Sequence, residues 1–242
     1  MFNYKMTIQY DGTNYAGWQI QQNAVSVQEI ISKSIKQIIQ EEVNLIGSGR
    51  TDAGVHALGQ VANFISNNEL DLFKFKYSLN SVLPNDISIS VIESVDINFH
   101  SRFDAKKRAY IYLITTQKSP FYNRYAYHLN TDFEISKMNE LASVFIGKKD
   151  FTSFSKNNPD AENKICEVFE AHWRKQKNLL IFYIEANRFL YGMVRASVGS
   201  ILKAYNLEDG IKHLEEIFNY KNRNEAADAV TAKGLFLYKV KY

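Results

Sequence analysis

The hydrophobic periodicity of this chain changes repeatedly between two residues and about 3.6 residues, and the order of these changes constrains the fold most strongly. Apolar and polar residues alternate over residues 4–10, a pattern typical of a half-buried strand. A capping box at Ser26 and Glu29 then opens a stretch with apolar residues at helical spacing. The first half predicts strand, helix, two strands, helix and strand, at residues 4–10, 27–39, 43–46, 60–65, 70–79 and 87–91.

The second half of the chain predicts the same order of elements without any visible repeat of individual residues. These elements are a strand, a helix closed by Gly147, two strands, a long helix and a last strand, at residues 108–116, 136–146, 165–173, 179–185, 190–205 and 236–242. Two successive split β-α-β units indicate an α+β protein with two ferredoxin-like halves. We expect the halves to span residues 1–100 and 101–242 and to join as one body.

Composition places the chain among ordinary globular proteins and excludes several classes. Of 242 residues, 45% are hydrophobic and 23% are charged, which argues against a disordered or fibrous chain. The longest apolar run, residues 179–184, is far shorter than the ~20 residues of a membrane helix. The first residues lack the layout of a secretory signal, so we expect a cytoplasmic protein. The single cysteine, Cys166, excludes an internal disulfide and a Cys-based zinc site, and a small buried hydrophobe is its simplest role.

The distribution of charge says more about a partner than the net charge does. The net charge is +3 and the pI about 8.7, below the ~9 of an overtly basic nucleic-acid-binding domain. Basic residues nevertheless gather at residues 102–108 and 148–149, and the chain contains 15 Tyr and 16 Phe. Such clusters suit a polyanion that carries stackable bases. A solvated charged surface over a Phe-rich core is the simpler alternative.

The stretch with the most chemical information is residues 47–60, which contains four glycines between two predicted strands. A loop of this kind can present the carboxylate of Asp52 beside the guanidinium of Arg50. An aspartate can act as nucleophile or base, and a neighbouring arginine keeps it ionised. Two alternatives are an aspartate that fixes a turn through its own backbone and a cation site, although no calcium-type ladder surrounds it. His56 is more simply a packed residue than a catalytic base.

Residues 49–57, Gly-Arg-Thr-Asp-Ala-Gly-Val-His-Ala, closely resemble the signature of the TruA family, tRNA pseudouridine synthase A. Other segments resemble the same family in the same order, and together they cover essentially the whole chain. These segments are residues 10–19, 26–29, 99–103, 107–112, 150–154, 189–199 and 234–235. Residues 155–164 match no part of the family pattern that we can align.

The resemblance implies a pseudouridine synthase fold, in which two ferredoxin-like halves form a continuous, largely antiparallel sheet with a central cleft. It implies isomerisation of uridine to pseudouridine at positions 38, 39 and 40 of the tRNA anticodon stem-loop, without cofactor or metal. It also implies a homodimer in which one tRNA touches both subunits.

The resemblance further implies roles for five residues. Asp52 is the nucleophile, attacking ribose C1′ or uracil C6, and Arg50 assists the flipping of the base out of its stack. Tyr110 stacks on the target uracil and takes part in proton transfer, Arg195 pairs with Asp52, and Leu235 contacts the substrate. From residue patterns alone, a core aromatic remains open for Tyr110 and a surface arginine beside an amphipathic stripe remains open for Arg195.

The surrounding RNA contacts are expected from the basic cluster at Arg102, Lys106, Lys107 and Arg108. Three other hypotheses compete with this one. The same enzyme could act on another uridine, since positioning depends on the surface and not on the Asp loop. A non-catalytic RNA-binding module is a second, although neither half shows an RNP1-like pattern. A glycosidase is the third, but no second carboxylate neighbours Asp52, and Asp11 falls in a predicted turn.

Overall fold

The computed structural model describes residues 1–156 and 163–242, which form two compact units of mixed α and β structure. Unit 1 comprises Met1–Lys106 and Phe236–Tyr242, and unit 2 comprises Lys107–Leu235. The prediction of an α+β fold is confirmed. The division differs from the expected boundary at residue 100, and the last strand joins unit 1 because it pairs with a strand of that unit.

Unit 1 is built on a largely antiparallel sheet. Strand β1 (Phe2–Tyr10) lies between β4 (Ile87–Val95) and β3 (His56–Ser66) and is antiparallel to both. The short β2 (Ile46–Gly47) is also antiparallel to β3, whereas β10 (Leu235–Lys241) runs parallel to it. The alternation predicted for the first strand is present, since the side chains at positions 4, 6, 8 and 10 are buried.

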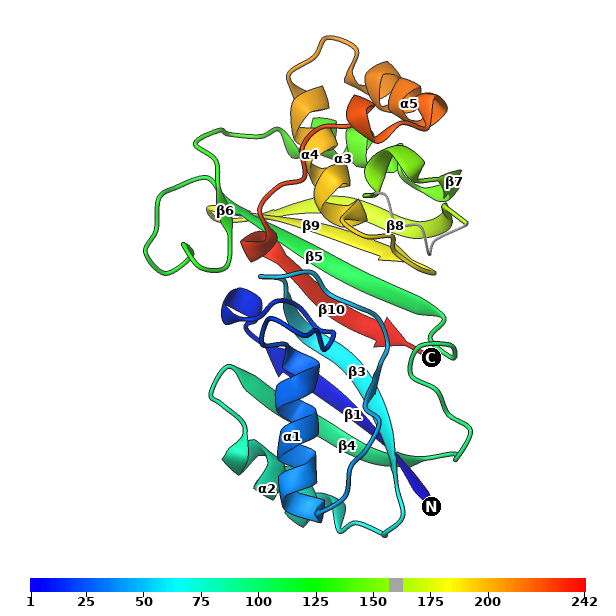
Figure 1. The fold of residues 1–242 in the computed structure, drawn as a ribbon. Coiled ribbons are helices and arrows are strands. Elements are labelled where there is room, and N and C mark those ends of the chain that lie inside the picture. Colours follow the sequence, from blue (N-terminus) through cyan, green and yellow to red (C-terminus); the bar gives the residue numbers. More distant parts are fainter. Residues whose placement is uncertain (157–162) are drawn as a thin grey trace. The chain divides into compact units, whose positions relative to one another are not determined.

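Two helices of unit 1, α1 (Val27–Ile39) and α2 (Leu72–Val82), pack against each other beside this sheet (Figure 1). The Ser26 hydroxyl accepts the N–H of Glu29 at 3.3 Å, so α1 begins at the predicted cap. Its inward face carries Val27, Ile31 and Ile35, each fully buried. Burying side chains of this size contributes about 1.5–3 kcal/mol each, which is more than the propensity of a helix this short supplies.

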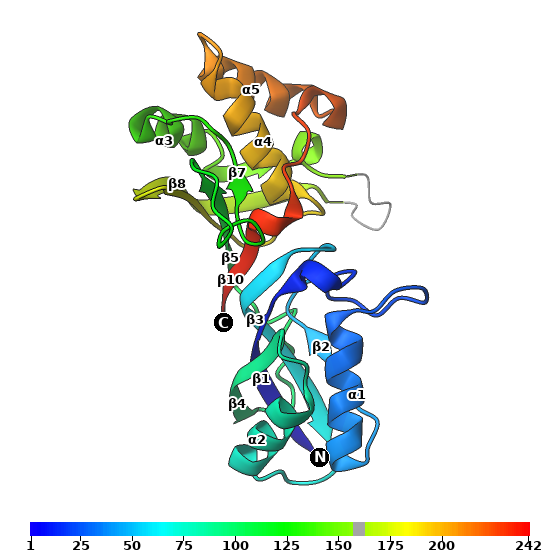
Figure 2. The ribbon, with the colours of Figure 1, turned by 90° about the vertical axis from the view of Figure 1, so that its left-hand side faces the viewer.

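The strands of unit 2 lie antiparallel to their neighbours in the order β5 (Lys107–Thr115), β9 (Leu179–Ala186), β8 (Ile165–Gln176) and β7 (Gly147–Asp150). A two-residue strand, β6 (Tyr127–His128), runs parallel to β5. The helices α3 (Ile135–Ser143), α4 (Met193–Tyr205) and α5 (Gly210–Tyr220) lie on one side of these strands (Figure 2).

The core of unit 2 is rich in phenylalanine. Phe145, Phe151 and Phe154 are fully buried, and their ring centroids lie 4.6–5.5 Å from that of Phe218 of α5. The edge-to-face and tilted geometries are those that aromatic rings prefer. This cluster fixes α5 against the segment that follows β7.

Several elements of unit 2 differ from the sequence-based prediction. Gly147 does not close α3; it begins β7 with φ 102°, a conformation that favours glycine. Helix α5 was not predicted, although the Asp209 carboxylate caps it by accepting the N–H of Lys212. Helix α4 starts at Met193 and not at residue 190, because Gly192 takes the left-handed conformation with φ 73°. No helix in the described part of the chain is long and apolar enough to cross a membrane.

We expect Cys166 to resist alkylation in the folded protein. Its thiol on β8 is fully buried, and burial raises its pKa to about 11. Both effects suppress the thiolate, which is the reactive form. Mass spectrometry should find no adduct after iodoacetamide treatment at pH 8 and complete modification in urea. Native modification at the rate of the unfolded chain would contradict this burial.

Candidate active site

The segment between β2 and β3, residues 48–55, is called here the Asp52 loop. Its first part is fixed by Gln60 on β3, whose Nε2 donates to the Gly49 carbonyl at 2.9 Å. The same side chain accepts the Ser48 hydroxyl at 2.7 Å through Oε1. Both Gln60 and Ser48 are buried, so these bonds are shielded from competing water.

The segment after β1, residues 11–18, clasps the other part of the Asp52 loop. The backbone N–H of Trp18 donates to the Thr51 carbonyl at 3.1 Å, and the N–H of Gly54 donates to the Tyr15 carbonyl. Gly17 permits this approach: its φ is 96°, and a Cβ there would lie 2.4 Å from the Thr51 carbonyl oxygen. The segment that resembles the family's first strand and turn therefore supports the loop.

Asp52 is the first residue of a tight turn in this loop. The N–H of Val55 donates to its carbonyl at 3.1 Å, and Gly54 supplies the positive φ, 74°, that a type II turn requires at its third residue. Asp52 is half-buried and Arg50 is exposed, whereas Thr51 between them is buried. The turn is closed by backbone atoms, so the carboxylate is not required to close it.

His56, the first residue of β3, is packed and hydrogen-bonded, as expected. Its ring is stacked on Phe236 of β10, with centroids 4.6 Å apart. Its Nδ1 accepts the N–H of Gly12 at 3.1 Å and lies 3.0 Å from a carboxylate oxygen of Asp11. Only 1% of the residue is exposed, so His56 is part of the support of the loop.

Tyr110 lies on β5 of unit 2 and is 9% exposed. Its ring meets the edge of the Phe189 ring at a centroid distance of 4.9 Å. Tyr112 and Ile114 share its face and are fully buried, and the Tyr112 hydroxyl donates to the Thr231 carbonyl. Tyr110 thus ends a buried row on β5 and is the member of that row that keeps some exposure.

Arg195 lies in the first turn of α4 and is half-buried. Its Nε donates to the Val230 carbonyl at 2.6 Å, and the N–H of Val230 donates to the Arg195 carbonyl. Gly199, one turn later, allows the segment around Asp228 and Val230 to approach the helix, since a Cβ at Gly199 would lie 2.2 Å from the Asp228 carbonyl oxygen. The guanidinium is therefore positioned by its own unit.

The predicted site residues divide between the units. Asp52 and Arg50 belong to unit 1, whereas Tyr110, Arg195 and the buried Leu235 belong to unit 2. Among the residues that the structure describes, no group of three or more His, Cys, Asp or Glu side chains could hold a metal ion.

The four basic residues predicted to contact RNA differ in what surrounds them. Arg102 and Lys106 are exposed. The Lys107 ammonium lies 3.3 Å from a carboxylate oxygen of the buried Glu185 and 4.1 Å from the centre of the Phe169 ring. Arg108 donates from Nη1 to the Asn187 carbonyl at 3.0 Å. Arg102 and Lys106 are therefore the more exposed of the four, and the Arg102 guanidinium lies 5.6 Å from the centre of the Phe103 ring.

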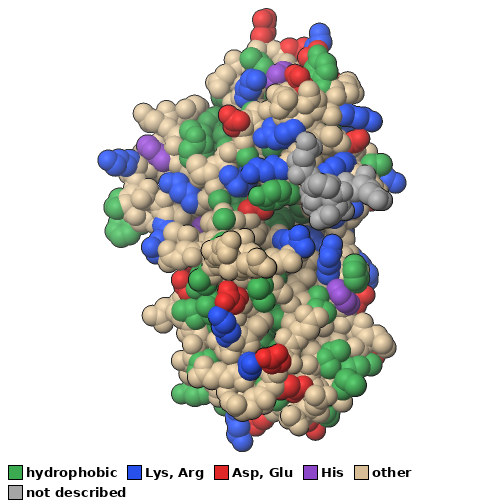
Figure 3. All heavy atoms as spheres, viewed as in Figure 1, with side chains coloured by type: hydrophobic (Ala, Val, Ile, Leu, Met, Phe, Trp, Pro, Cys, Tyr) green, Lys and Arg blue, Asp and Glu red, His purple; other side chains and the backbone are tan. Residues whose placement is uncertain are grey.

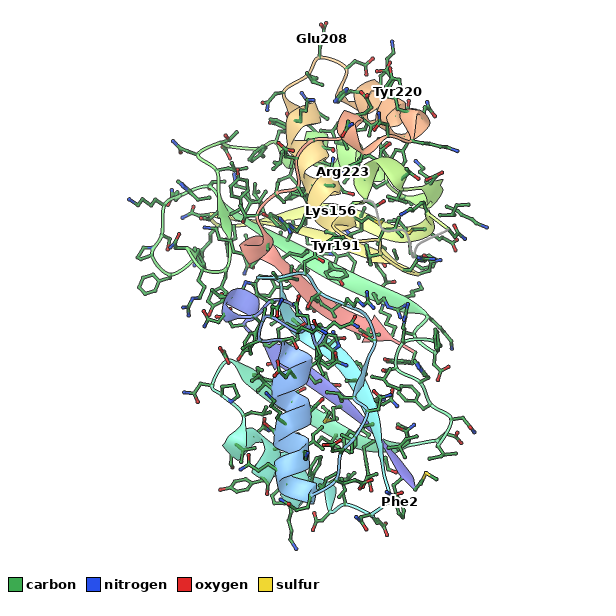
Figure 4. All side chains as sticks on the ribbon, viewed as in Figure 1. Phe2, Lys156, Tyr191, Glu208, Tyr220 and Arg223 are labelled. Atoms are coloured by element: carbon green, nitrogen blue, oxygen red, sulfur yellow. The ribbon has the colours of Figure 1, made fainter. Side chains whose placement is uncertain are left out.

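A basic and aromatic pair beside α4 was not predicted. The Lys156 ammonium lies 5.1 Å from the centre of the half-exposed Tyr191 ring, and the Lys156 N–H donates to the Tyr191 carbonyl. Figure 4 labels this pair, and Figure 3 shows Lys and Arg side chains over the same face of unit 2. Lys156 belongs to the unmatched segment 155–164, of which residues 157–162 lie outside the described residues. Tyr191 belongs to segment 189–199, which resembles the family, and this resemblance is the sequence feature that could have indicated it.

A polar hollow of about 330 Å³ also lies in unit 2, lined among others by Gln117, Asp132, Lys175 and Asn178. These groups bind one another: Lys175 pairs with Asp132 at 2.6 Å, and Asn178 donates to Gln117 at 2.7 Å. None of the predicted site residues lines this hollow.

Comparison with known proteins defines the class of enzyme. A family model described as tRNA pseudouridine synthase matches residues 6–104 and 141–242, which include the Asp52 loop and the segment around Arg195. This match covers more than half of the chain and defines the class, a pseudouridine synthase, which is an isomerase.

The full-length relatives agree. A protein of Thermoanaerobacter sp. strain X514, named tRNA pseudouridine synthase A, is 42% identical over the whole of both chains. Another of that name, from Bacteroides fragilis, is 40% identical over 99% of this chain and 96% of the relative. This chain belongs to the tRNA pseudouridine synthase family. A chain of the crystallised Cbf5-Nop10-Gar1 complex is more distant, with TM-score 0.42 and 13% identity over 83% of this chain and 44% of that one.

Proposed function

We propose that this enzyme converts uridine to pseudouridine at positions 38, 39 and 40 of the tRNA anticodon stem-loop, with Asp52 as the nucleophile. The observation that carries the proposal is the Asp52 loop itself: a half-buried carboxylate in a turn that buried side chains and backbone atoms hold in place. Preorganisation of this kind keeps a reacting group in position before the substrate arrives.

The reaction moves one bond of the nucleotide. The Asp52 carboxylate attacks either ribose C1′ or uracil C6, and the bond between C1′ and N1 breaks. The freed uracil turns, C5 bonds to C1′, the carboxylate leaves, C5 loses its proton and N1 gains one. The target base must leave its stack first, because a helix shields the glycosidic bond. We assign to Arg50, which is exposed two residues before Asp52, the filling of the space that the base vacates.

The remaining roles fall to unit 2. We assign to Tyr110 stacking on the uracil and a part in the proton transfer, to Arg195 an ion pair with Asp52, and to Leu235 a substrate contact. The Arg195 bonds to Val230 hold its guanidinium in one orientation, which suits a bidentate bond to a carboxylate. We further propose that the enzyme works in the cytoplasm as a homodimer.

Tritium release tests the activity. Unmodified tRNA labelled with tritium at uracil C5 is incubated with the enzyme in EDTA, and the label freed as water is counted. We expect release from tRNA with uridine at positions 38 to 40, and none when cytidine replaces those uridines. Release that persists after all three replacements would assign the enzyme to another uridine. Tight binding without release from any tRNA would favour an RNA-binding module.

Salt dependence tests the RNA contacts. Replacing Lys106 or Arg102 by Gln should reduce the slope of log affinity against log salt by about one for each lost phosphate contact. Lys33→Gln is the matched control, because Lys33 pairs with Glu29 on the exposed side of α1. Filter binding between low and physiological salt measures the slopes. Unchanged slopes in both variants would remove Lys106 and Arg102 from the interface.

A further inference from the structure

The buried tyrosine at the end of β1 connects the core of unit 1 to the Asp52 loop. The hydroxyl of Tyr10 lies 2.7 Å from the hydroxyl of Thr51, and the residues are 4% and 6% exposed. Tyr10 belongs to the same buried row of β1 as Tyr4, on the strand that lies beside β3 in Figure 1. Thr51 separates Arg50 from Asp52, so whatever fixes Thr51 also fixes the backbone on both sides of it.

The bond between these hydroxyls is one of three contacts that hold residues 49–51 of the Asp52 loop in place. Gln60 holds Gly49, and the Trp18 N–H holds the Thr51 carbonyl. The hydroxyl of Thr51 also needs a hydrogen-bond partner, because burying a hydroxyl without one costs about 1–3 kcal/mol. Burial raises the pKa of the Tyr10 hydroxyl above its usual range, although bonds to Thr51 and Gln60 lower it, so the group stays protonated.

Tyr10 is too deeply buried to contact a nucleotide. Its ring packs near Trp18, with centroids 6.2 Å apart, and Trp18 is itself 3% exposed. Any effect of its hydroxyl on the reaction must therefore pass through the loop. The carboxylate of Asp52 follows Thr51 directly, and a displacement of about 1 Å in a reacting group can lower a rate by about 100-fold.

We propose that the hydrogen bond between Tyr10 and Thr51 positions the Asp52 carboxylate for its attack on the flipped nucleotide, which makes both residues positioning residues of the reaction. The inference rests on the proposed role of Asp52. It explains why the Tyr10 hydroxyl is buried beside the loop, and why Thr51 is buried although Arg50 and Asp52 on either side of it are accessible.

The test compares two buried tyrosines on one strand. Tyr4 is as buried as Tyr10, and its hydroxyl accepts the N–H of Leu70 at 2.8 Å, so Tyr4→Phe also removes one buried hydroxyl. We expect Tyr10→Phe to lower the single-turnover rate of tritium release about tenfold, with KM for tRNA changed less than about twofold. Tyr4→Phe should leave both constants within about twofold of the wild type.

Thr51 variants complete the cycle. Thr51→Val should lower the rate no more than Tyr10→Phe does, because Tyr10→Phe also removes the bond to Gln60. The double variant should lose no more than Tyr10→Phe alone, because the bond that Thr51→Val removes is already absent there. Thr51→Ser keeps the hydroxyl and should restore the rate. Thermal unfolding of every variant verifies that the chain is folded at the assay temperature.

The outcomes separate this inference from the proposed function. If Tyr10→Phe is no slower than Tyr4→Phe, or if the two losses multiply, the bond does not position Asp52. If Asp52→Asn stays active while Tyr10→Phe is slow, the role of Asp52 fails and the rate effect belongs to another group of the loop. A rise in KM with an unchanged rate would assign Tyr10 to binding and overturn the proposal.

Discussion

Replacing Asp52 by Asn should lower the single-turnover rate of tritium release from C5-labelled tRNA by at least about 10⁴-fold. The amide has nearly the same size as the carboxylate, so the turn closed by Val55 and Gly54 should persist. An amide does not attack C1′ or C6, so the proposed covalent step should be lost. The affinity for tRNA, measured by filter binding, should change little, because binding energy comes mainly from phosphate and base contacts spread over the surface.

Asp71→Asn is the matched control for this substitution. Asp71 caps α2 by accepting the N–H of Lys74 at 3.1 Å, and asparagine caps a helix about as well as aspartate. The same chemical change at Asp71 should therefore leave both rate and stability close to those of the wild type. An Asp52→Asn enzyme that released tritium within about tenfold of the wild-type rate would exclude Asp52 as the nucleophile.

Replacing Gly17 by Ala should strongly destabilise unit 1. Alanine at φ 96° is strained by about 1–3 kcal/mol, and its Cβ would lie 2.4 Å from the Thr51 carbonyl oxygen. Residues 11–18 must move away from the Asp52 loop to relieve that contact, and this movement breaks the bond from the Trp18 N–H to the Thr51 carbonyl. We expect a total loss of about 3 kcal/mol in the free energy of unfolding, together with a reduced rate of tritium release.

Gly147→Ala separates strain from contact. Gly147 has φ 102°, but no atom lies within 4 Å of the position that a Cβ would take. This variant should lose only the strain energy of about 1–3 kcal/mol and should keep full activity. Urea unfolding followed by tryptophan fluorescence measures both variants, since Trp18 lies in unit 1 and Trp173 in unit 2. Equal losses of stability, with equal activities, would show that the close approach of Gly17 to the Thr51 carbonyl does not matter for the loop.

Local patterns predicted the elements that depend on local physics. The alternation over residues 4–10 and the cap at Ser26 gave β1 and α1 nearly to the residue, because burial of one face and one hydrogen bond decide them. Asp209 could have predicted α5 in the same manner, since Leu214 and Ile217 follow it at helical spacing and are buried. Those signals are local ones that the sequence itself contains.

Distant partners determine the elements that the sequence did not predict. Strand β3 starts at His56, four residues before its predicted start, because β10 pairs with that end. The second predicted strand, residues 43–46, shrinks to Ile46–Gly47, where the indole of Trp18 packs against Gly47.

The candidate site also has a part that the sequence predicts and a part that depends on distant contacts. Its family-like residues were identified from the sequence. The support of the Asp52 loop by Tyr10 and Gln60 depends on contacts that no local pattern records.

The return of the chain to unit 1 in β10 has a consequence for synthesis on the ribosome. Unit 2, Lys107–Leu235, is translated between the two parts of unit 1, which takes on the order of ten seconds at about 5–20 residues per second. Throughout that interval β3 lacks its parallel neighbour, and His56 lacks the Phe236 ring on which it stacks. The end of β3 next to the Asp52 loop is therefore completed last, after the whole of unit 2 has been translated.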